Sequence, residues 1–357
     1  MGWRQQADQM AFKITKTRFR TLFAAAVSTL IAVYGAQAQD KVLNLYSARH
    51  YSTDEALYSN FTKATGIKIN RLEGGEDQLL QRIKSEGANS PADVFLTVDA
   101  GRLWLANQEG VFAPIQSKVL NERIPAAYRL ASNTWYGLST RARVMVVDKL
   151  KVKPGEIATY EDLADPKWKG QVCTRSGSHV YMLSLISSII EHAGAEKAEA
   201  WAKGVVANLA RQPKGGDTDQ IKAVAAGECA VALSNSYYIA RMIKSDKTDD
   251  RAAMERVRIV WPNTSGRGVH MNVSGGGVLK YAPNRDNAIK FMEYLVSDEA
   301  QGYFANGNNE WPIVSGLKVK NPALDAMGVF KPDSINMIAL GKNQRLAQEI
   351  VNRVGWK

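Results

Sequence analysis

The sequence is poor in the residues and motifs that mark most enzymes and zinc sites. Its 357 residues include two cysteines and four histidines, and the histidines, at positions 50, 179, 192 and 270, do not follow the spacing of zinc ligands. A GxSxG elbow, a Walker loop, an HExxH helix and a GxGxxG turn at a strand–helix junction are all missing. We therefore expect a protein without catalytic activity. The alternative from a different functional class is an exported enzyme on a two-lobed fold, but the sequence contains no recognisable nucleophile or base.

The sequence also lacks a hydrophobic run long enough to cross a membrane, which takes about 20 apolar residues. Its longest run, "TLFAAAVSTLIAV" at 21–33, follows a basic leader and precedes the small-residue pattern Ala36–Gln37–Ala38. These are the parts of a secretory signal peptide. We expect residues 1–38 to be removed, with cleavage after about Ala38, and the mature protein to be soluble and exported to the periplasm.

Positive charge is in modest excess. Removing residues 1–38 takes five basic residues and one acidic residue from totals of 46 and 35, which leaves seven more positive than negative charges. The basic residues are scattered and accompany no RNA- or DNA-binding motif. We therefore expect no nucleic-acid partner.

The two cysteines, Cys173 and Cys229, lie in the short apolar stretches "GQVCTRS" and "GECAVALS", which are typical of strands. In an exported protein a pair of cysteines favours a disulfide. Two free, buried thiols are the alternative that the sequence leaves open. The spacing fits neither a metal motif nor a redox motif.

What the sequence does contain is a regular alternation of strands and helices. Apolar alternation predicts a strand at 42–48, and an apolar run predicts a strand at 93–99 that is buried on both faces. Helical periodicity predicts helices at about 53–64 and 76–86, with Gly66 beyond the end of the first and Gly87 as the stop of the second. Repetition of this kind predicts an α/β fold with mostly parallel sheets and flanking helices. After an extended stretch at 135–149 the alternation restarts, with helices expected at about 180–193, 195–209 and 287–305 and further extended segments at 256–262 and 268–280.

The mature length predicts two lobes, because one core seldom serves so many residues. Two extended segments flank the second α/β unit, so we expect the chain to cross between the lobes twice and the crossing strands to act as the hinge. The expected division places residues 39–137 and 263–310 in lobe 1, and residues 138–262 and 311–357 in lobe 2. A ligand would then bind in the cleft between them. The glycines of "SGGG" at 274–277 are expected to form a turn entering a strand, with close backbone packing.

Four tyrosines follow the carboxyl ends of predicted strands, which is where open α/β sheets place their ligand sites. They are Tyr51, Tyr181, Tyr237 and Tyr238. Each alone is typical of a core or rim aromatic. Together they have no evident packing purpose, because loops at strand ends usually lie on the surface.

Clustered phenols suit a hard, highly charged cation. Iron(III) is well matched to phenolate oxygen, whereas zinc prefers His or Cys and calcium prefers carboxylates. A bound cation also removes the protons of its ligands, so the usual tyrosine pKa near 10 is no obstacle. Several phenolates on one ion leave surplus negative charge. Arg241, one helical turn after Tyr238, and Arg141 are the candidates to offset it.

Five stretches resemble the ferric-ion-binding periplasmic proteins, the solute-binding subunits of ABC iron importers. They are "SARHY", "DVFLTVDAGRL", "SNSYYIAR", "GVHMNVSGGGVLK" and "EYLVSDEAQGYFANGNNEWP". The resemblance runs from about Val42 to the C-terminus and implies the two-lobed type II periplasmic-binding fold with two hinge strands. The paired tyrosines are its most specific part.

The resemblance implies Tyr237 and Tyr238 as iron ligands, with His50 or Tyr51 contributed by the opposite lobe. Many members carry a glutamate ligand where this sequence has Val98, which favours the branch familiar from cyanobacteria, in which Tyr51 and Tyr181 complete the set. His50 is then an adjunct, and no synergistic anion is favoured. Three residues remain available to hold an anion: Ser176, Ser178 and Asn235.

We therefore expect a monomeric protein that captures Fe(III) between its lobes and delivers it to the permease of an ABC importer in the inner membrane. The rival ligand is an organic cation such as thiamine or a polyamine, boxed by aromatic rings through cation–π contacts. Acidic side chains should line such a cleft, whereas the strand-end loops of this sequence carry arginines.

Overall fold

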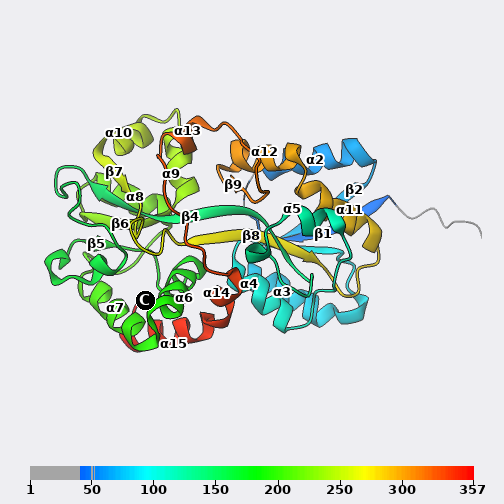
Figure 1. The fold of residues 1–357 in the computed structure, drawn as a ribbon, viewed down its shortest axis with the longest axis horizontal. Helices are drawn as coiled ribbons and strands as arrows, with labels where there is room; N and C mark the ends of the chain where they lie inside the picture. The colour runs from blue at the N-terminus through cyan, green and yellow to red at the C-terminus, as the bar shows by residue number, and fades with distance from the viewer. Residues whose placement is uncertain (1–40, 50, 52) are drawn as a thin grey trace, which may run out of the picture. The chain divides into compact units, whose positions relative to one another are not determined.

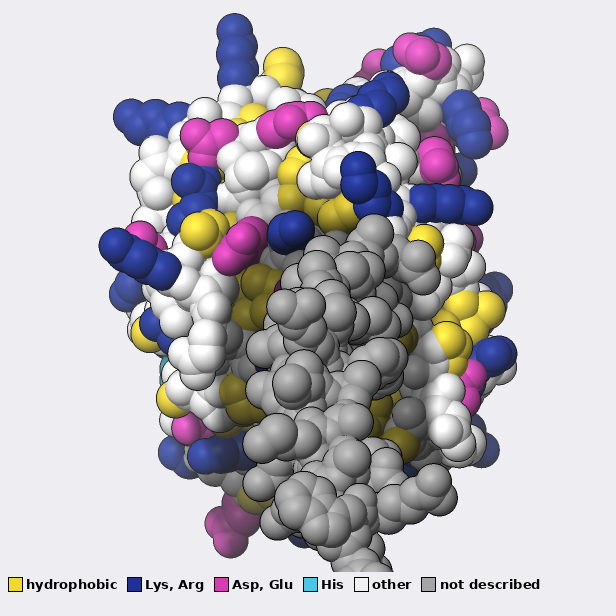
Figure 2. Space-filling view, turned by 90° about the vertical axis from the view of Figure 1, so that its right-hand side faces the viewer, with side chains coloured by type: hydrophobic (Ala, Val, Ile, Leu, Met, Phe, Trp, Pro, Cys, Tyr) yellow, Lys and Arg dark blue, Asp and Glu magenta, His cyan; other side chains and the backbone are white. Residues whose placement is uncertain are grey.

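The computed structural model describes residues 41–49, 51 and 53–357, and the expected signal peptide lies outside these residues. Within the described ranges, no helix is both long enough and apolar enough to cross a membrane. On the face shown in Figure 2, the Lys and Arg side chains are interspersed with Asp and Glu and do not form one continuous basic surface.

A single mixed sheet organises residues 41–357, with the strand order β2-β1-β3-β8-β4-β6-β5. Two further strands, β7 and β9, pair with β4 outside this order. The strands are β1 (Val42–Ser47), β2 (Lys68–Glu73), β3 (Val94–Thr97), β4 (Tyr136–Asp148), β5 (Val172–Cys173), β6 (Val231–Asn235), β7 (Val257–Val260), β8 (Met271–Val278) and β9 (Trp311–Pro312).

The α/β class is confirmed, but the sheet is mixed and not mostly parallel. β1 pairs in parallel with β2 and β3, and β5 pairs in parallel with β6. β8 runs antiparallel to both β3 and β4, and β4 runs antiparallel to β6, β7 and β9. The two long extended segments of the sequence therefore become the central antiparallel pair β4 and β8, which lie side by side across the middle of Figure 1.

Helices cover the sheet and connect its strands. Up to Ala207 they are α2 (Asp54–Thr65), α3 (Glu76–Glu86), α4 (Ala100–Gln108), α5 (Lys118–Arg123), α6 (Val180–Ala193) and α7 (Ala195–Ala207). After Ala207 they are α8 (Asp217–Ala225), α9 (Ser236–Ile243), α10 (Thr248–Arg256), α11 (Arg285–Leu295), α12 (Asp298–Asn308), α13 (Pro322–Asp325), α14 (Met337–Lys342) and α15 (Gln344–Val354). Short 3-10 turns occupy Gly87–Asn89, Ala126–Tyr128, Glu161–Ala164 and Pro166–Trp168.

The predicted helix at 287–305 is wrong as a single element, because the chain breaks it into α11 and α12. The side chain of Ser297 accepts a hydrogen bond from the backbone N–H of Ala300 and so caps a new helix. A serine cap satisfies one of the N–H groups that a helix start leaves without a partner. The apolar periodicity continues across the break, which is why the sequence favoured one helix.

The predicted glycine turn at 274–277 is also wrong, since these residues lie inside β8. The expected close packing is confirmed. A Cβ on Gly276 would lie 2.5 Å from the backbone oxygen of Phe95 and 2.4 Å from the Cδ2 atom of Leu96. Glycine therefore lets β3 and β8 approach where no side chain fits.

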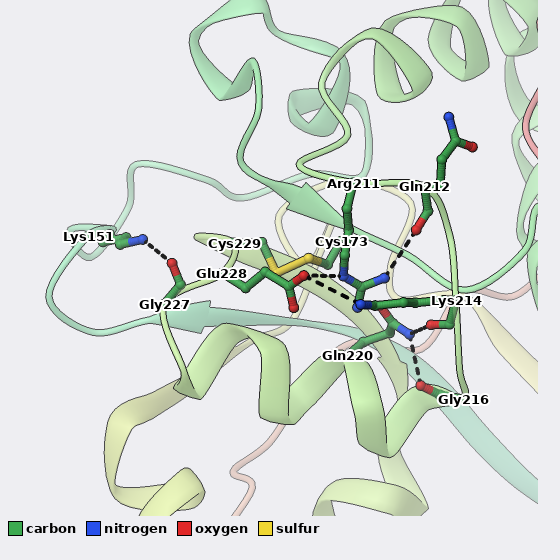
Figure 3. Close-up of a disulfide and its surroundings, with 10 residues drawn as sticks. All are labelled: Lys151, Cys173, Arg211, Gln212, Lys214, Gly216, Gln220, Gly227, Glu228 and Cys229. Carbon is green, nitrogen blue, oxygen red and sulfur yellow. Dashed lines mark hydrogen bonds and ion pairs between the residues drawn. A yellow bond between two sulfur atoms is a disulfide. The ribbon is translucent and has the colours of Figure 1, made fainter.

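Cys173 and Cys229 form the expected disulfide, with their Cα atoms 5.9 Å apart. Both residues are buried. The bridge joins the end of β5 to the segment that enters β6, and Figure 3 shows it beside the ion pair of Arg211 and Glu228. The cross-link therefore holds β5, the strand that precedes α6, to the segment that enters β6.

The apolar core has two large clusters and one small one. The larger clusters lie around Phe95 and Phe291 in one case, and around Leu185 and Trp201 in the other. The small cluster is separate and consists mostly of tyrosines. It contains the residues that the sequence singled out.

Candidate metal centre

The structure brings the four tyrosines together, and we call this group the tyrosine cluster. Tyr51 follows β1, Tyr181 lies in the first turn of α6, and the adjacent pair Tyr237–Tyr238 lies in the first turn of α9. The exposed fractions of Tyr51, Tyr181 and Tyr237 are 7%, 4% and 0%, and Tyr238 is partly buried against them. The expectation of surface positions is wrong, because these loops and helix ends face one another.

The phenol groups of the cluster lie in direct contact. The Tyr237 hydroxyl donates a hydrogen bond of 3.0 Å to the Tyr181 hydroxyl. The rings of Tyr51 and Tyr237 meet edge to face with centroids 5.6 Å apart. The rings of Tyr237 and Tyr238 are 4.3 Å apart and inclined by 35°. The two adjacent rings at the start of α9 therefore lie in contact with each other.

Burial keeps these phenols protonated in the absence of a ligand. It raises the pKa of Tyr51, Tyr181 and Tyr237 well above the ordinary value of 10, because a phenolate loses its hydration there. Neighbouring negative groups add to the effect, while the Arg141 guanidinium acts in the opposite direction on all three. A strongly charged cation would be needed to replace the protons.

Arginines surround the cluster, as the sequence led us to expect for Arg141 and Arg241. Arg141, on β4, is 1% exposed, and its Nη1 atom donates to Ser274 while its Nε and Nη2 atoms have no hydrogen-bond partner among the described residues. Its guanidinium carbon lies 5.9 Å from the centre of the Tyr181 ring. Arg241 is exposed and lies 5.4 Å from the centre of the Tyr238 ring.

Two further arginines face the cluster and were not predicted. Arg49 lies 4.7 Å from the centre of the Tyr51 ring, and Arg175 lies 5.0 Å from the centre of the Tyr181 ring. Arg49 stands in the "SARHY" stretch and Arg175 in "CTRSGSH", so their positions beside the tyrosines were a signal that could have been used.

A buried carboxylate, Glu310, is the other residue that the sequence analysis missed. It is 0% exposed and accepts a hydrogen bond of 3.2 Å from the Tyr51 hydroxyl. It also lies 3.5 Å from the Arg49 guanidinium. Glu310 and Tyr51 are 259 positions apart in the chain, so no local pattern relates them.

Histidine contributes less than phenol to the described site. His50 lies outside the described residues. His179 caps α6, and its Nδ1 atom accepts a hydrogen bond from the Tyr181 backbone N–H. Burial, with Arg175 nearby, lowers the pKa of His179 to about 3, so its imidazole is neutral. Across the residues that the structure describes, no group of three or more His, Cys, Asp or Glu side chains is arranged to hold a metal ion.

Val98 lies in the tyrosine cluster, with 4% exposure. An apolar side chain therefore faces the phenols at the position where the resembling family often has a glutamate. The Glu76 carboxylate approaches this strand end, and its Oε1 atom accepts hydrogen bonds from the Thr97 hydroxyl and the Val98 backbone N–H. Phenol oxygens thus dominate the donor set.

Of the three residues that could hold an anion, Asn235 is already engaged. Its Oδ1 atom accepts from Arg143, and its backbone N–H donates to Asp217. The Ser176 hydroxyl accepts from the backbone N–H of Ser178. The buried Asp217 carboxylate beside Asn235 would repel an added anion at that point.

Comparisons with known proteins identify the family of this chain. A family model described as bacterial extracellular solute-binding protein matches residues 89–329. Iron uptake protein A1 of Synechocystis sp. is 49% identical over 319 residues, which covers 89% of this chain and 88% of that protein. Iron uptake protein A2 of the same organism is 47% identical over 350 residues, covering 96% and 99%.

Among solved structures, a Trichodesmium protein, IdiA (FutA), in complex with iron and citrate ligands has a TM-score of 0.84 and 55% identity, covering 88% of this chain and 100% of that chain. The chain therefore has the α/β fold of these binding proteins, and the expectation that it is not an enzyme is confirmed by its family. The chain belongs to the bacterial extracellular solute-binding proteins, in the branch that contains the cyanobacterial iron uptake proteins.

Proposed function

We propose that the protein binds Fe(III) at the tyrosine cluster, through the phenolate oxygens of Tyr51, Tyr181, Tyr237 and Tyr238, and carries it to an ABC importer. The observation that carries the proposal is the contact among buried phenols, with a 3.0 Å hydrogen bond between the Tyr237 and Tyr181 hydroxyls. Burial raises the pKa of three of these phenols, so they keep their protons until a strongly charged cation takes the protons' place.

Charge balance supports a trivalent ion. Four phenolates around Fe(III) leave one negative charge, and the buried carboxylates of Glu310 and Asp54 add two more. Arg49, which pairs with both carboxylates, and Arg141 supply two positive charges within the same group of contacts. The site then keeps one surplus negative charge, which a synergistic anion would increase, so we favour coordination by protein oxygens alone. His50, next to Tyr51 in the chain, is proposed as an adjunct.

We infer a two-lobed carrier in which lobe 1 comprises residues 39–137 and 263–310, and lobe 2 comprises residues 138–262 and 311–357. Tyr51 would come from lobe 1, and the other three tyrosines from lobe 2. An ion held by both sides favours the closed form, because only that form completes its coordination. β4 and β8 would act as the hinge strands. The carrier would work as a monomer in the periplasm and pass its ion to a permease in the inner membrane.

The test is a titration of the ion-free protein with ferric nitrilotriacetate and, separately, with ferric citrate. We expect a visible phenolate-to-iron absorption band with either source. Tyr237→Phe and Tyr238→Phe should each weaken the band and lower the affinity at least tenfold. Tyr281→Phe is the matched control, because Tyr281 is 50% exposed and lies outside the cluster.

Two results would contradict the proposal. A band that forms only with citrate would overturn the part that excludes an anion. A colourless protein that binds thiamine or spermidine tightly would overturn iron binding itself. The structure disfavours an organic cation, since arginines already lie over the rings of Tyr51, Tyr181 and Tyr238.

A further inference from the structure

Glu310 is a buried carboxylate with four donors around it. Its Oε1 atom accepts from the Tyr51 hydroxyl at 3.2 Å and from the Ser274 hydroxyl at 3.1 Å. Its Oε2 atom accepts from the Ser139 hydroxyl at 2.8 Å and lies 3.5 Å from Arg49. Every neighbour in this set donates to it, so the carboxylate is fully engaged.

The two serines lie on different strands, Ser139 on β4 and Ser274 on β8. They are direct partners in the β4–β8 ladder, at the point where the register shifts between Gly137 and Ser139. A register shift of this kind bends the strand locally and disrupts the ladder. Glu310 therefore bridges the central strand pair at its irregular position.

The backbone around Glu310 is equally tied to this place. Its N–H donates to the Phe304 carbonyl, and the next residues form β9, in which Trp311 pairs with Thr140 of β4. The carboxylate therefore moves with β4. On its other side it holds the phenol of Tyr51, the candidate ligand contributed by the first part of the chain.

We propose that Glu310 is a positioning residue that fixes the Tyr51 phenol and mechanically couples it to the hinge strands β4 and β8. This inference rests on the proposed function of the tyrosine cluster. In the ion-free protein the Tyr51 hydroxyl is tied through Glu310 to Ser139 and Ser274. An ion that takes the place of the phenol proton also removes this hydrogen bond, because a phenolate has nothing to donate to the carboxylate. Ion binding therefore releases Tyr51 from the strand pair, and a change in the strand pair shifts the ion-free Tyr51 relative to Tyr237.

The first variant is Glu310→Gln, which preserves the shape of the side chain. In this variant one oxygen of the side chain becomes an NH2 group, which cannot accept the hydrogen bonds that the carboxylate accepted. The hydrogen bonds of Tyr51 and Ser274 therefore have to reorganise. Glu299→Gln is the matched control, because it removes the same charge from an exposed position in the first turn of α12. We expect Glu310→Gln to shift the wavelength of the phenolate-to-iron band and to raise iron affinity about tenfold, because a neutral amide replaces the carboxylate that repels the Tyr51 phenolate, and we expect the control to do neither.

The second variant, Ser139→Ala with Ser274→Ala, removes the hydroxyls on the strands and leaves the bond between Glu310 and Tyr51. Small-angle X-ray scattering with and without ferric nitrilotriacetate measures the closure of the protein. We expect this variant to show a smaller iron-dependent decrease in radius of gyration than the wild type. Thermal melts of the ion-free variants establish that they are folded.

The outcomes separate this inference from the proposed function. If the wild type forms the band and both variants match it in wavelength, affinity and compaction, Glu310 does not position Tyr51 and the inference is overturned. If only Glu310→Gln differs, the coupling to the strands is overturned. If the wild type forms no band, the proposed iron site fails and this inference fails with it.

Discussion

The disulfide between Cys173 and Cys229 makes a quantitative prediction about stability. The two residues are separated by 56 positions, and the segment between them contains α6, α7 and α8. Breaking the bridge frees this segment in the unfolded chain and leaves the folded contacts largely in place. We therefore expect reduction to destabilise the protein mainly through the unfolded state.

The size of the effect follows from the loop length. Closing a loop of this size lowers the entropy of the unfolded chain by about 14 cal/mol/K, which is about 4 kcal/mol at 25 °C. Unfolding entropies near 2.1 cal/mol/K per residue over Lys41–Lys357 give about 0.7 kcal/mol/K for the whole unit. The predicted decrease in Tm is therefore about 6 °C.

The assay compares calorimetric melts of ion-free wild type before and after reduction with a phosphine, at equal pH and ionic strength. The double variant Cys173→Ala, Cys229→Ala, measured without reductant, controls for effects of the reductant itself. A Tm that changes by less than about 1 °C on complete reduction would refute the reasoning, because the cross-link would then contribute nothing through the unfolded chain. A thiol count on the unfolded protein verifies the redox state.

Two further predictions concern buried positions outside the tyrosine cluster. Burial, with Arg143 nearby, lowers the pKa of His270 to about 3, so stability should fall as pH decreases from 6.5, by up to about 1.4 kcal/mol per pH unit. His270→Gln should flatten the dependence of Tm on pH between 7 and 5, and equal slopes for both proteins would contradict this. Gly276→Ala should destabilise the protein by about 1–3 kcal/mol, because the new Cβ meets Leu96 and the neighbouring backbone. The same change at Gly302, inside α12 with open space around it, should instead stabilise by about 0.5–1 kcal/mol, and urea unfolding that shows the same sign for both would refute the packing argument.

The positions of helices and strands were predictable wherever the hydrophobic periodicity and the residues that end an element, such as glycine, agreed. The helices expected at 76–86 and 180–193 are α3 and α6 with the same bounds, and α3 is followed by Gly87, whose φ is 53°. The prediction of one helix at 287–305 was wrong because Ser297 caps a new helix there, although the apolar periodicity of the sequence continues across the break. The prediction of mostly parallel sheets was wrong because the antiparallel pairing of β4 and β8 joins distant segments, and local sequence patterns do not encode it.

The sequence predicted the tyrosines of the site, but it did not predict the polar residues that surround them. Tyr181 and Tyr237 follow β5 and β6, which are adjacent and parallel, so their proximity followed from the strand assignment. The approach of Tyr51 did not follow, because β1 is separated from β6 by β3, β8 and β4 and runs in the opposite direction. The burial of the tyrosines did not follow either, since it depends on how the strand ends and helix starts face one another. Glu310 was missed because its role arises from contacts with Tyr51 and Ser139 that only the folded chain creates.

The place of β8 in the sheet has a consequence for how the chain reaches its folded state. β8 lies between β3 and β4, although both of those strands precede it in the chain by more than a hundred positions. Until Val278 has been synthesised, the centre of the sheet is missing, and β3 and β4 present unpaired edges. A nascent chain cannot complete its native sheet from the amino terminus onward, as many domains do. In an exported protein with this strand order, the native sheet therefore forms only after β8 has been synthesised, which favours translocation of the chain before it folds.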